Sequence, residues 1–276
     1  DCCWQTEGVY FEPAFSGQIR KPLNQLPVLD LSPRKVICRR CAAELAPGSV
    51  ANLGVGIPAD VASVVAECGC SDKITITAEA GGIGGVPAAL PNFGSNYNAE
   101  AINSHNSMFD FIDGGGLDIT VLGLAEADER GNINVSKFGD RLSGPGGFID
   151  ITQSAKKVVF AGTFMAKAKE SIVDGNLVIA EEGSTRKFVD AVQQVTFSGQ
   201  NARPGQTVLY VTERCVLQLI DGKMTVIEVA PGIDLERDVL SQMDFRPAVH
   251  PDLKTMDPGL FCEEWDYLRS AFGADR

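Results

Sequence analysis

The chain has 276 residues, enough for one large or two small domains, and its 44% hydrophobic and 22% charged residues are typical of a globular α/β protein. A formal charge of −12 argues against nucleic-acid binding, because neutralising phosphates requires clustered Lys and Arg. No apolar run approaches the roughly 20 residues that a membrane-spanning helix needs. We therefore expect neither a nucleic-acid partner nor a membrane partner.

The first 30 residues are irregular and contain several prolines, so we predict a connector there. A helix is predicted from 32 to 45, with Ser32 as its N-cap and Pro33 in its first turn. The Pro-Gly pair at 47–48 ends this helix.

Two β–loop elements follow. A strand at 49–56 leads directly into a helix at 57–68, and a second strand at 73–78 ends on Glu79. Further apolar runs predict strands at 118–127, 156–162 and 207–212.

The C-terminal third begins with an Asp-Gly pair at 221–222 between two apolar runs, which predicts a hairpin. A closing helix is predicted at 235–245, and the Pro-rich tail from Arg246 is predicted to wrap the surface. Strands that alternate with helices indicate an α/β fold with a mainly parallel sheet flanked by helices.

Glycine-rich loops follow the first two strands, at 54–58 and 79–85. Ligands of open parallel sheets bind beyond the carboxyl ends of the strands, and glycines let a ligand approach the main chain closely. Glu79 is the only carboxylate where an apolar strand meets such a loop, and a glutamate can attack an activated carbonyl such as a thioester. The pattern alone also fits a solvated glutamate at a strand end, with glycines that serve only the turn.

Other chemistries have weaker signals. Cys38 and Cys41 form a CxxC pair within a predicted helix, and neither His105 nor His250 has metal-site spacing to a cysteine pair. We therefore expect reduced thiols in a cytosolic protein and no metal. The glycines at 54–56 lack the third glycine of a dinucleotide fingerprint, and no GxSxG motif of a serine hydrolase is present.

Four segments together resemble family I CoA-transferases: NLGVGIP (52–58), the glutamate with its glycine-rich loop (79–85), FDFIDGGGLDITVLGLAEADERGNINVS (109–136) and SGPGGFIDITQSAKKVVFAGTF (143–164). The resemblance runs from about residue 33 to the end and includes 230–247. It is closest to the branch of acyl-CoA:acetate/3-oxoacid and propionate CoA-transferases, whose two halves are fused in one chain. It implies a NagB/RpiA-like open α/β fold over residues 31–276, similar to the C-terminal, β-type half.

The resemblance also implies roles for individual residues. Glu79 matches the glutamate that forms a covalent glutamyl-CoA thioester during ping-pong transfer of CoA from an acyl-CoA to a carboxylic acid. Asn52 matches the asparagine that contacts CoA. No cofactor beyond CoA itself is implied. The glycines expected to line the substrate site or to stabilise an oxyanion are Gly54, Gly56, Gly81, Gly82, Gly146 and Gly147.

Two departures limit these implications. Oxoacid-specific relatives carry SENG around the glutamate where this chain has AEAGG (78–82), so their acyl specificity cannot be carried over. The α-type half of the family has no counterpart here, and residues 1–30 resemble the linker that would join it. The chain also begins at Asp1, which fits a processed form, a fragment or half of a longer polypeptide. We expect the α-type half to be a separate subunit or the N-terminal part of the same polypeptide, in an oligomer.

The leading hypothesis is thus a CoA-transferase acting on acetate, propionate or 3-oxoacid substrates in short-chain fatty acid or ketone-body metabolism. Its compartment would be the cytoplasm, or the mitochondrial matrix in a eukaryote. An acyl-CoA hydrolase of the same fold and a non-catalytic ligand-sensing domain are the alternatives. Glu79 distinguishes the two enzyme hypotheses from the ligand-sensing domain, because a sensor has no need of a carboxylate between glycine loops.

Overall fold

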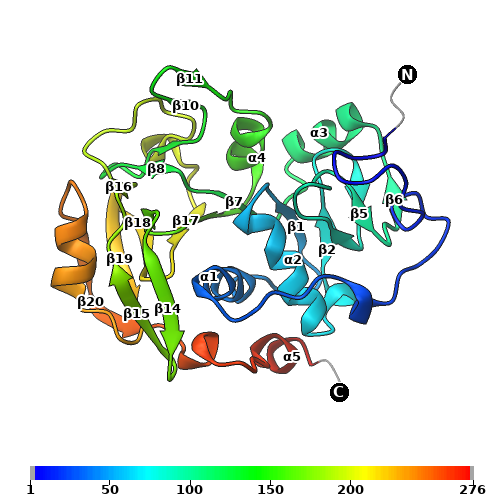
Figure 1. Cartoon of the computed structure of the whole chain (residues 1–276). Helices are drawn as coiled ribbons and strands as arrows, with labels where there is room; N and C mark the ends of the chain where they lie inside the picture. The colour runs from blue at the N-terminus through cyan, green and yellow to red at the C-terminus, as the bar shows by residue number, and fades with distance from the viewer. Residues whose placement is uncertain (1–3, 274–276) are drawn as a thin grey trace.

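The computed structural model describes residues 4–273, which fold around one ten-stranded sheet (Figure 1). Its five central strands are parallel to one another. In sheet order they are β17 (Thr207–Val211), β12 (Lys157–Ala161), β7 (Ile119–Gly123), β1 (Val50–Leu53) and β2 (Thr75–Thr77). The predicted α/β fold with a mainly parallel sheet is confirmed.

Further strands extend the sheet on both sides of this parallel centre. Antiparallel pairing adds β18 (Cys215–Ile220) and β19 (Lys223–Val229) beyond β17, and β3 (Gly82–Ile83) and β6 (Ala101–Ile102) beyond β2. The predicted hairpin is confirmed, since Asp221 and Gly222 join β18 to β19 with φ of 51° and 73°. Two positive φ angles are what a two-residue type I′ turn requires.

Helices cover both faces of the sheet. One face packs against α1 (Pro33–Ala42) and α2 (Ile57–Glu67), and the other against α3 (His105–Asp113) and α4 (Phe148–Ser154). Successive strand residues point to opposite faces, so Val121 joins the first core and Leu122 the second. Figure 1 shows α3 and α4 at the top of the view and the last helix, α5 (Tyr267–Phe272), at the bottom.

Short elements fill the connections. Five two-stranded antiparallel sheets lie within residues 4–273: β4 (Val86–Pro87) with β5 (Asn96–Tyr97), β8 (Glu126–Ala127) with β9 (Ile133–Asn134), β10 (Lys137–Phe138) with β11 (Arg141–Leu142), β13 (Met165–Ala166) with β16 (Thr185–Arg186), and β14 (Lys169–Val173) with β15 (Asn176–Glu181). Single 3-10 turns occur at Leu23–Gln25, Ser71–Lys73, Gly199–Asn201, Leu240–Gln242 and Pro258–Phe261. None of the helices in this described part of the chain is long and apolar enough to span a bilayer.

The helix predicted at 32–45 begins as expected, with the Ser32 hydroxyl accepting a hydrogen bond from the Lys35 main chain at 3.3 Å.

The helix predicted at 235–245 is wrong in type. A π-helical turn (Leu235–Val239) and a 3-10 turn take its place. The buried Arg214 guanidinium donates to the Asp238 carbonyl at 3.0 Å, an acceptor that a regular α-helix would use for its own next turn.

The Pro-rich tail from Arg246, predicted to wrap the surface, contains regular structure. The tail forms β20 (Ala248–Thr255) at the edge of the sheet, parallel to β19, and then α5. Pro251 falls between the two paired stretches of β20, at 248–249 and 254–255. An edge strand tolerates a proline there because no ladder donor is lost.

The N-terminal segment contains one 3-10 turn among its described residues, and its assignment as a connector stays a prediction. The segment packs on the body of the protein. Ala14, Phe15 and Leu26 are buried, and the Phe15 and Tyr97 rings lie 4.5 Å apart. It therefore holds the β4–β5 hairpin in place.

A buried charge cluster joins the β14–β15 hairpin to the sheet. The Arg214 side chain is fully buried and binds the carboxylates of Glu170 and Glu182, at 2.7 and 2.8 Å from its Nη2. Glu213 is also fully buried, and both its carboxylate oxygens accept from the Phe164 main-chain N–H. Burial and the nearby Glu170 carboxylate raise the pKa of Glu213.

We predict that Arg214→Leu lowers the free energy of unfolding by about 3–5 kcal/mol, because it leaves buried carboxylates without a counter-charge. Urea unfolding would measure the change. The matched control is Arg246→Leu, which removes an exposed arginine paired with Glu236 and should have a far smaller effect. Equal losses in the two variants would contradict this account of the cluster.

Candidate active site

A pocket of about 360 Å³ lies where the carboxyl ends of β1, β2 and β7 meet. The three strands are parallel neighbours, so the residues after each one reach the same edge of the sheet. Gly54 and Val55 follow β1, Glu79 follows β2, and Gly123 ends β7. The segment 143–148 closes the opposite wall.

Among the described residues that line this pocket, Glu79 has the only ionisable side chain. It is half-buried, and its carboxylate makes no hydrogen bond or ion pair with any other of residues 4–273. Burial raises the pKa of Glu79 above its ordinary value, and the exposed His105 at the start of α3 acts in the opposite direction. An unpaired, partly desolvated carboxylate is a stronger nucleophile than a hydrated one.

The glycines of segment 143–148 make room for this carboxylate. A Cβ on Gly147 would lie 2.4 Å from Glu79 Oε2 and 2.7 Å from the Phe109 ring, so a larger residue there would displace the carboxylate or the ring. Gly146 has φ of 54°, a conformation that favours glycine. The main-chain N–H groups of Gly146 and Gly147 donate no hydrogen bond within the described chain, and both residues line the pocket.

The loop after β1 has similar constraints. A Cβ on Gly54 would lie 2.7 Å from Leu122 Cδ2, so this glycine lets the loop pass close to β7. Gly56 has φ of 86° and ψ of −130° and is the N-cap of α2. It lies beside the pocket lining and is not part of it.

Three other predicted site residues do not line the pocket. Asn52 is buried within the sheet, where its side chain bridges the Thr77 carbonyl and the Thr120 hydroxyl, each at 3.4 Å. Gly81 and Gly82 are required by packing, since a Cβ on either would meet Asn103 or Asn96. The substrate-contacting roles of these residues stay predictions.

The structure adds apolar residues that the sequence patterns did not identify. Phe93 comes from the β4–β5 hairpin, Val135 follows β9, and Phe148 and Ile151 come from α4. Apart from Phe93, they lie far from Glu79 in sequence. An aromatic residue beside a glycine, as in Phe93–Gly94, was the only local signal available.

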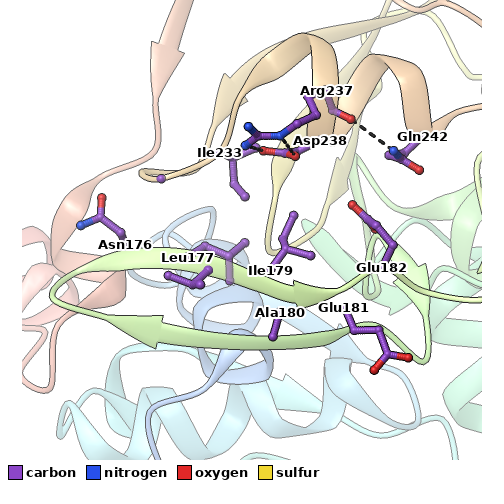
Figure 2. A pocket seen from close by; sticks show the side chains of 12 residues that line it. Asn176, Leu177, Ile179, Ala180, Glu181, Glu182, Ile233, Arg237, Asp238 and Gln242 are labelled. Atoms are coloured by element: carbon purple, nitrogen blue, oxygen red, sulfur yellow. Dashed lines mark hydrogen bonds and ion pairs between the residues drawn. The ribbon is translucent and has the colours of Figure 1, made fainter.

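A second groove of about 490 Å³ lies between the β14–β15 hairpin and residues 232–242, shown in Figure 2. It shares no residue with the Glu79 pocket. Its charged groups are paired within the protein, Arg237 with Asp238 at 2.7 Å and Glu182 with Arg214. The Glu182–Arg214 pair joins the hairpin to the body of the protein.

Six cysteine thiols lie within residues 4–273, and none of them forms a disulfide. Cys38 and Cys41 are buried in α1, and burial raises the pKa of each thiol, that of Cys41 to about 12. They are therefore protonated and unreactive at neutral pH. Cys2 and Cys3 lie outside the described residues.

No group of three or more His, Cys, Asp or Glu side chains in the described part of the chain is arranged to hold a metal ion.

Comparison with known proteins places this site in a family. Residues 36–239 match the family model of coenzyme A transferases, and the chain belongs to this family. It is 63% identical to the caffeate CoA-transferase of Acetobacterium woodii, over 99% of this chain and 53% of that protein. It is 33% identical to the acetate CoA-transferase subunit beta of Escherichia coli K12, over 79% of this chain and 95% of that subunit.

A solved relative is the acyl-CoA transferase YdiF of E. coli O157:H7, whose crystal structure is described as a thioester complex with CoA. The TM-score is 0.80 at 43% identity, and the match covers 87% of this chain and 46% of that one. The chain thus spans about half the length of the full-length relatives it matches and nearly all of a β subunit.

We predict that Gly147→Ala lowers the rate of any reaction at Glu79 by roughly 100-fold, because the added methyl displaces the carboxylate by about an ångström. The rate of covalent modification at Glu79 would measure it. Gly259→Ala is the control, since Gly259 lies in a 3-10 turn outside this pocket and its added methyl would come no closer than 3.3 Å to a neighbouring atom. A similar loss in both variants would mean that Gly147 does not position Glu79.

We also predict that Glu79→Gln stabilises the protein at pH 7. The folded-state pKa of Glu79 is raised, so the wild-type protein loses stability as the pH rises through the interval between its unfolded and folded pKa values. The variant lacks this loss, and its advantage in melting temperature should disappear at pH values below the ordinary glutamate pKa. Glu100→Gln, on an exposed residue nearby, controls for removal of one negative charge.

Proposed function

We propose that this chain is the β-type half of a CoA-transferase and that Glu79 is its nucleophile. The observation that carries the proposal is the unpaired, half-buried carboxylate of Glu79, which lines a glycine-rich pocket at the carboxyl edge of the sheet. The YdiF relative, crystallised as a thioester complex with CoA, supports a covalent route in this branch of the family.

The proposed reaction begins when the Glu79 carboxylate attacks the carbonyl carbon of an acyl-CoA. The carbon–sulfur bond breaks, CoA leaves as its thiolate, and an acyl-glutamyl anhydride forms. The thiolate then attacks the glutamyl carbonyl, which releases the first acid as a carboxylate and leaves CoA joined to Glu79 as a thioester. An acceptor carboxylate reverses these steps, so the kinetics are ping-pong.

Each attack develops negative charge on a carbonyl oxygen. The unused N–H groups of Gly146 and Gly147 and the N-terminus of α2 behind Gly56 are suited to stabilise that charge. Desolvation around Glu79 favours the neutral anhydride and thioester over the separated carboxylate. The proposed route uses no cofactor beyond CoA itself.

We propose that activity requires an α-type half, as a separate subunit or as the preceding part of the same polypeptide, within an oligomer. The near-complete coverage of a β subunit and the half coverage of longer relatives support this. The acid substrates belong to the proposal too. We propose acids of the acetate, propionate and 3-oxoacid class as substrates, and the names of the relatives include both acetate and caffeate. The proposed setting is short-chain fatty acid or ketone-body metabolism. The proposed compartment is the cytoplasm, or the mitochondrial matrix in a eukaryote.

We predict that mixing the complete enzyme with acyl-CoA adds one CoA, less one water, to the peptide that contains Glu79. Mass spectrometry of the digested protein would detect it. The adduct should be absent from Glu79→Gln, which keeps the size of the side chain but cannot form the anhydride. No adduct on the wild-type enzyme during turnover would refute the covalent route.

The same preparation separates a transferase from a hydrolase. When acetate is added to the loaded enzyme, a transferase returns the CoA as acetyl-CoA, whereas a hydrolase releases free CoA thiol. The ratio of the two products, followed by chromatography, distinguishes these activities.

A further inference from the structure

The wall of the Glu79 pocket is mainly apolar, and apart from Glu79 itself the polar side chain among its described lining residues is that of Ser143. Phe93, Leu122, Phe148 and Ile151 line the cavity, and no Lys, Arg or His occurs among the lining residues within 4–273. An acyl group held at Glu79 therefore meets hydrocarbon on the side that this chain supplies.

Phe93 occupies a special place in that wall. The other apolar lining side chains named above belong to β7 or α4, whereas Phe93 lies in the connection between β4 and β5. This connection is secured at its base, where the Asn96 amide donates to the Gly84 carbonyl at 2.9 Å within the loop that follows Glu79. The position of Phe93 is thus tied to that of the nucleophile.

The N-terminal segment secures the same connection from outside. The Thr6 hydroxyl donates to the side-chain oxygen of Asn92 at 2.6 Å, directly beside Phe93. Asn98, just after β5, accepts a hydrogen bond from the Lys21 main-chain N–H and donates one to the Lys21 carbonyl. These contacts attach the connection that carries Phe93 to the N-terminal segment.

From these observations we propose that the site selects neutral acyl groups with an extended apolar body, including planar aromatic ones, and that Phe93 determines this specificity. The inference rests on the proposed function of Glu79. A pocket of about 360 Å³ lies within the range of about 300–1,000 Å³ typical of small-molecule sites.

Two physical effects produce this selection. An apolar chain or ring gains by leaving water against Phe93 and its neighbours, whereas an acetyl group is too short to contact most of that wall. A second carboxylate, as in a succinyl group, would lose its hydration without meeting a cation in this wall. The first effect favours long apolar acids over acetate, and the second disfavours dicarboxylates.

The test uses the complete enzyme, loaded with CoA at Glu79, and four acceptor acids: acetate, pentanoate, cinnamate and succinate. Pentanoate and succinate are similar in length and differ in the second charge. We expect kcat/KM for pentanoate and cinnamate to exceed that for succinate at least roughly tenfold. Succinate accepted as well as pentanoate would overturn the proposed selection by charge.

Phe93→Ala tests the assigned residue. We expect kcat/KM to fall by roughly 10- to 100-fold for cinnamate and to change less than about twofold for acetate, with Phe93→Leu intermediate for cinnamate. Val249→Ala, on an exposed residue of β20, is the distant control and should change neither. A parallel fall for both acids, or no fall for cinnamate, would overturn the role of Phe93.

Thr6→Val tests the support of the wall, because it removes the hydroxyl that holds Asn92 and leaves the lining intact. It should lower the preference for cinnamate over acetate in the same direction as Phe93→Ala, by a smaller factor. Formation of the CoA adduct on Glu79 is measured for each variant with acetyl-CoA. If Phe93→Ala forms the adduct normally and keeps the acid preference of the wild type, the proposed specificity is refuted and the proposed function stands. If the wild type forms no adduct, the proposed function itself is refuted.

Discussion

The parallel pairing of β1 with β2 and β7 determines where the reactive parts of this protein lie. Asn52 pairs with Thr77 on one side and Thr120 on the other, so the three strands end at almost the same level. The loops after them must then share one edge of the sheet. Asn52 strengthens this register, since its buried amide bridges both neighbouring strands. Its place in the NLGVGIP motif has a structural cause, whatever it contacts in the substrate complex.

This arrangement places a carboxylate where the fold gives it no partner within residues 4–273. Other buried charges have partners, as in the ion-pair cluster of Arg214 with Glu170 and Glu182 and the hydrogen bonds that Asn132 donates to Asp128. Glu79 has none in that part of the chain, and burial raises the pKa of its side chain. Active sites commonly retain such locally unfavourable groups, because pairing the group would also remove its reactivity. The paired clusters elsewhere stabilise the scaffold that holds it.

Long-range contacts complete the site in ways that short patterns cannot reveal. The segment carrying Gly147 lies far beyond Glu79 in the sequence, yet the absence of a Cβ at Gly147 is what admits the carboxylate. Phe93 reaches the pocket because the N-terminal segment and the β4–β5 hairpin are held together by Thr6, Asn92 and Asn98. The same limit applies outside the site. Arg214 diverts the Asp238 carbonyl from an α-helix, and β20 forms because β19 offers a free edge.

The amino-acid sequence by itself determined the fold class, the strands of the parallel centre, the β18–β19 hairpin and the position of Glu79 at a strand end, because these depend on local periodicity, turn chemistry and short motifs. Tertiary structure alone decided which glycines face the nucleophile, which serve packing, and which apolar side chains enclose the cavity. Gly81 and Gly147 look equivalent in the sequence, but one makes room for Asn103 and the other for Glu79. That difference depends on residues brought together by folding, which no local pattern encodes.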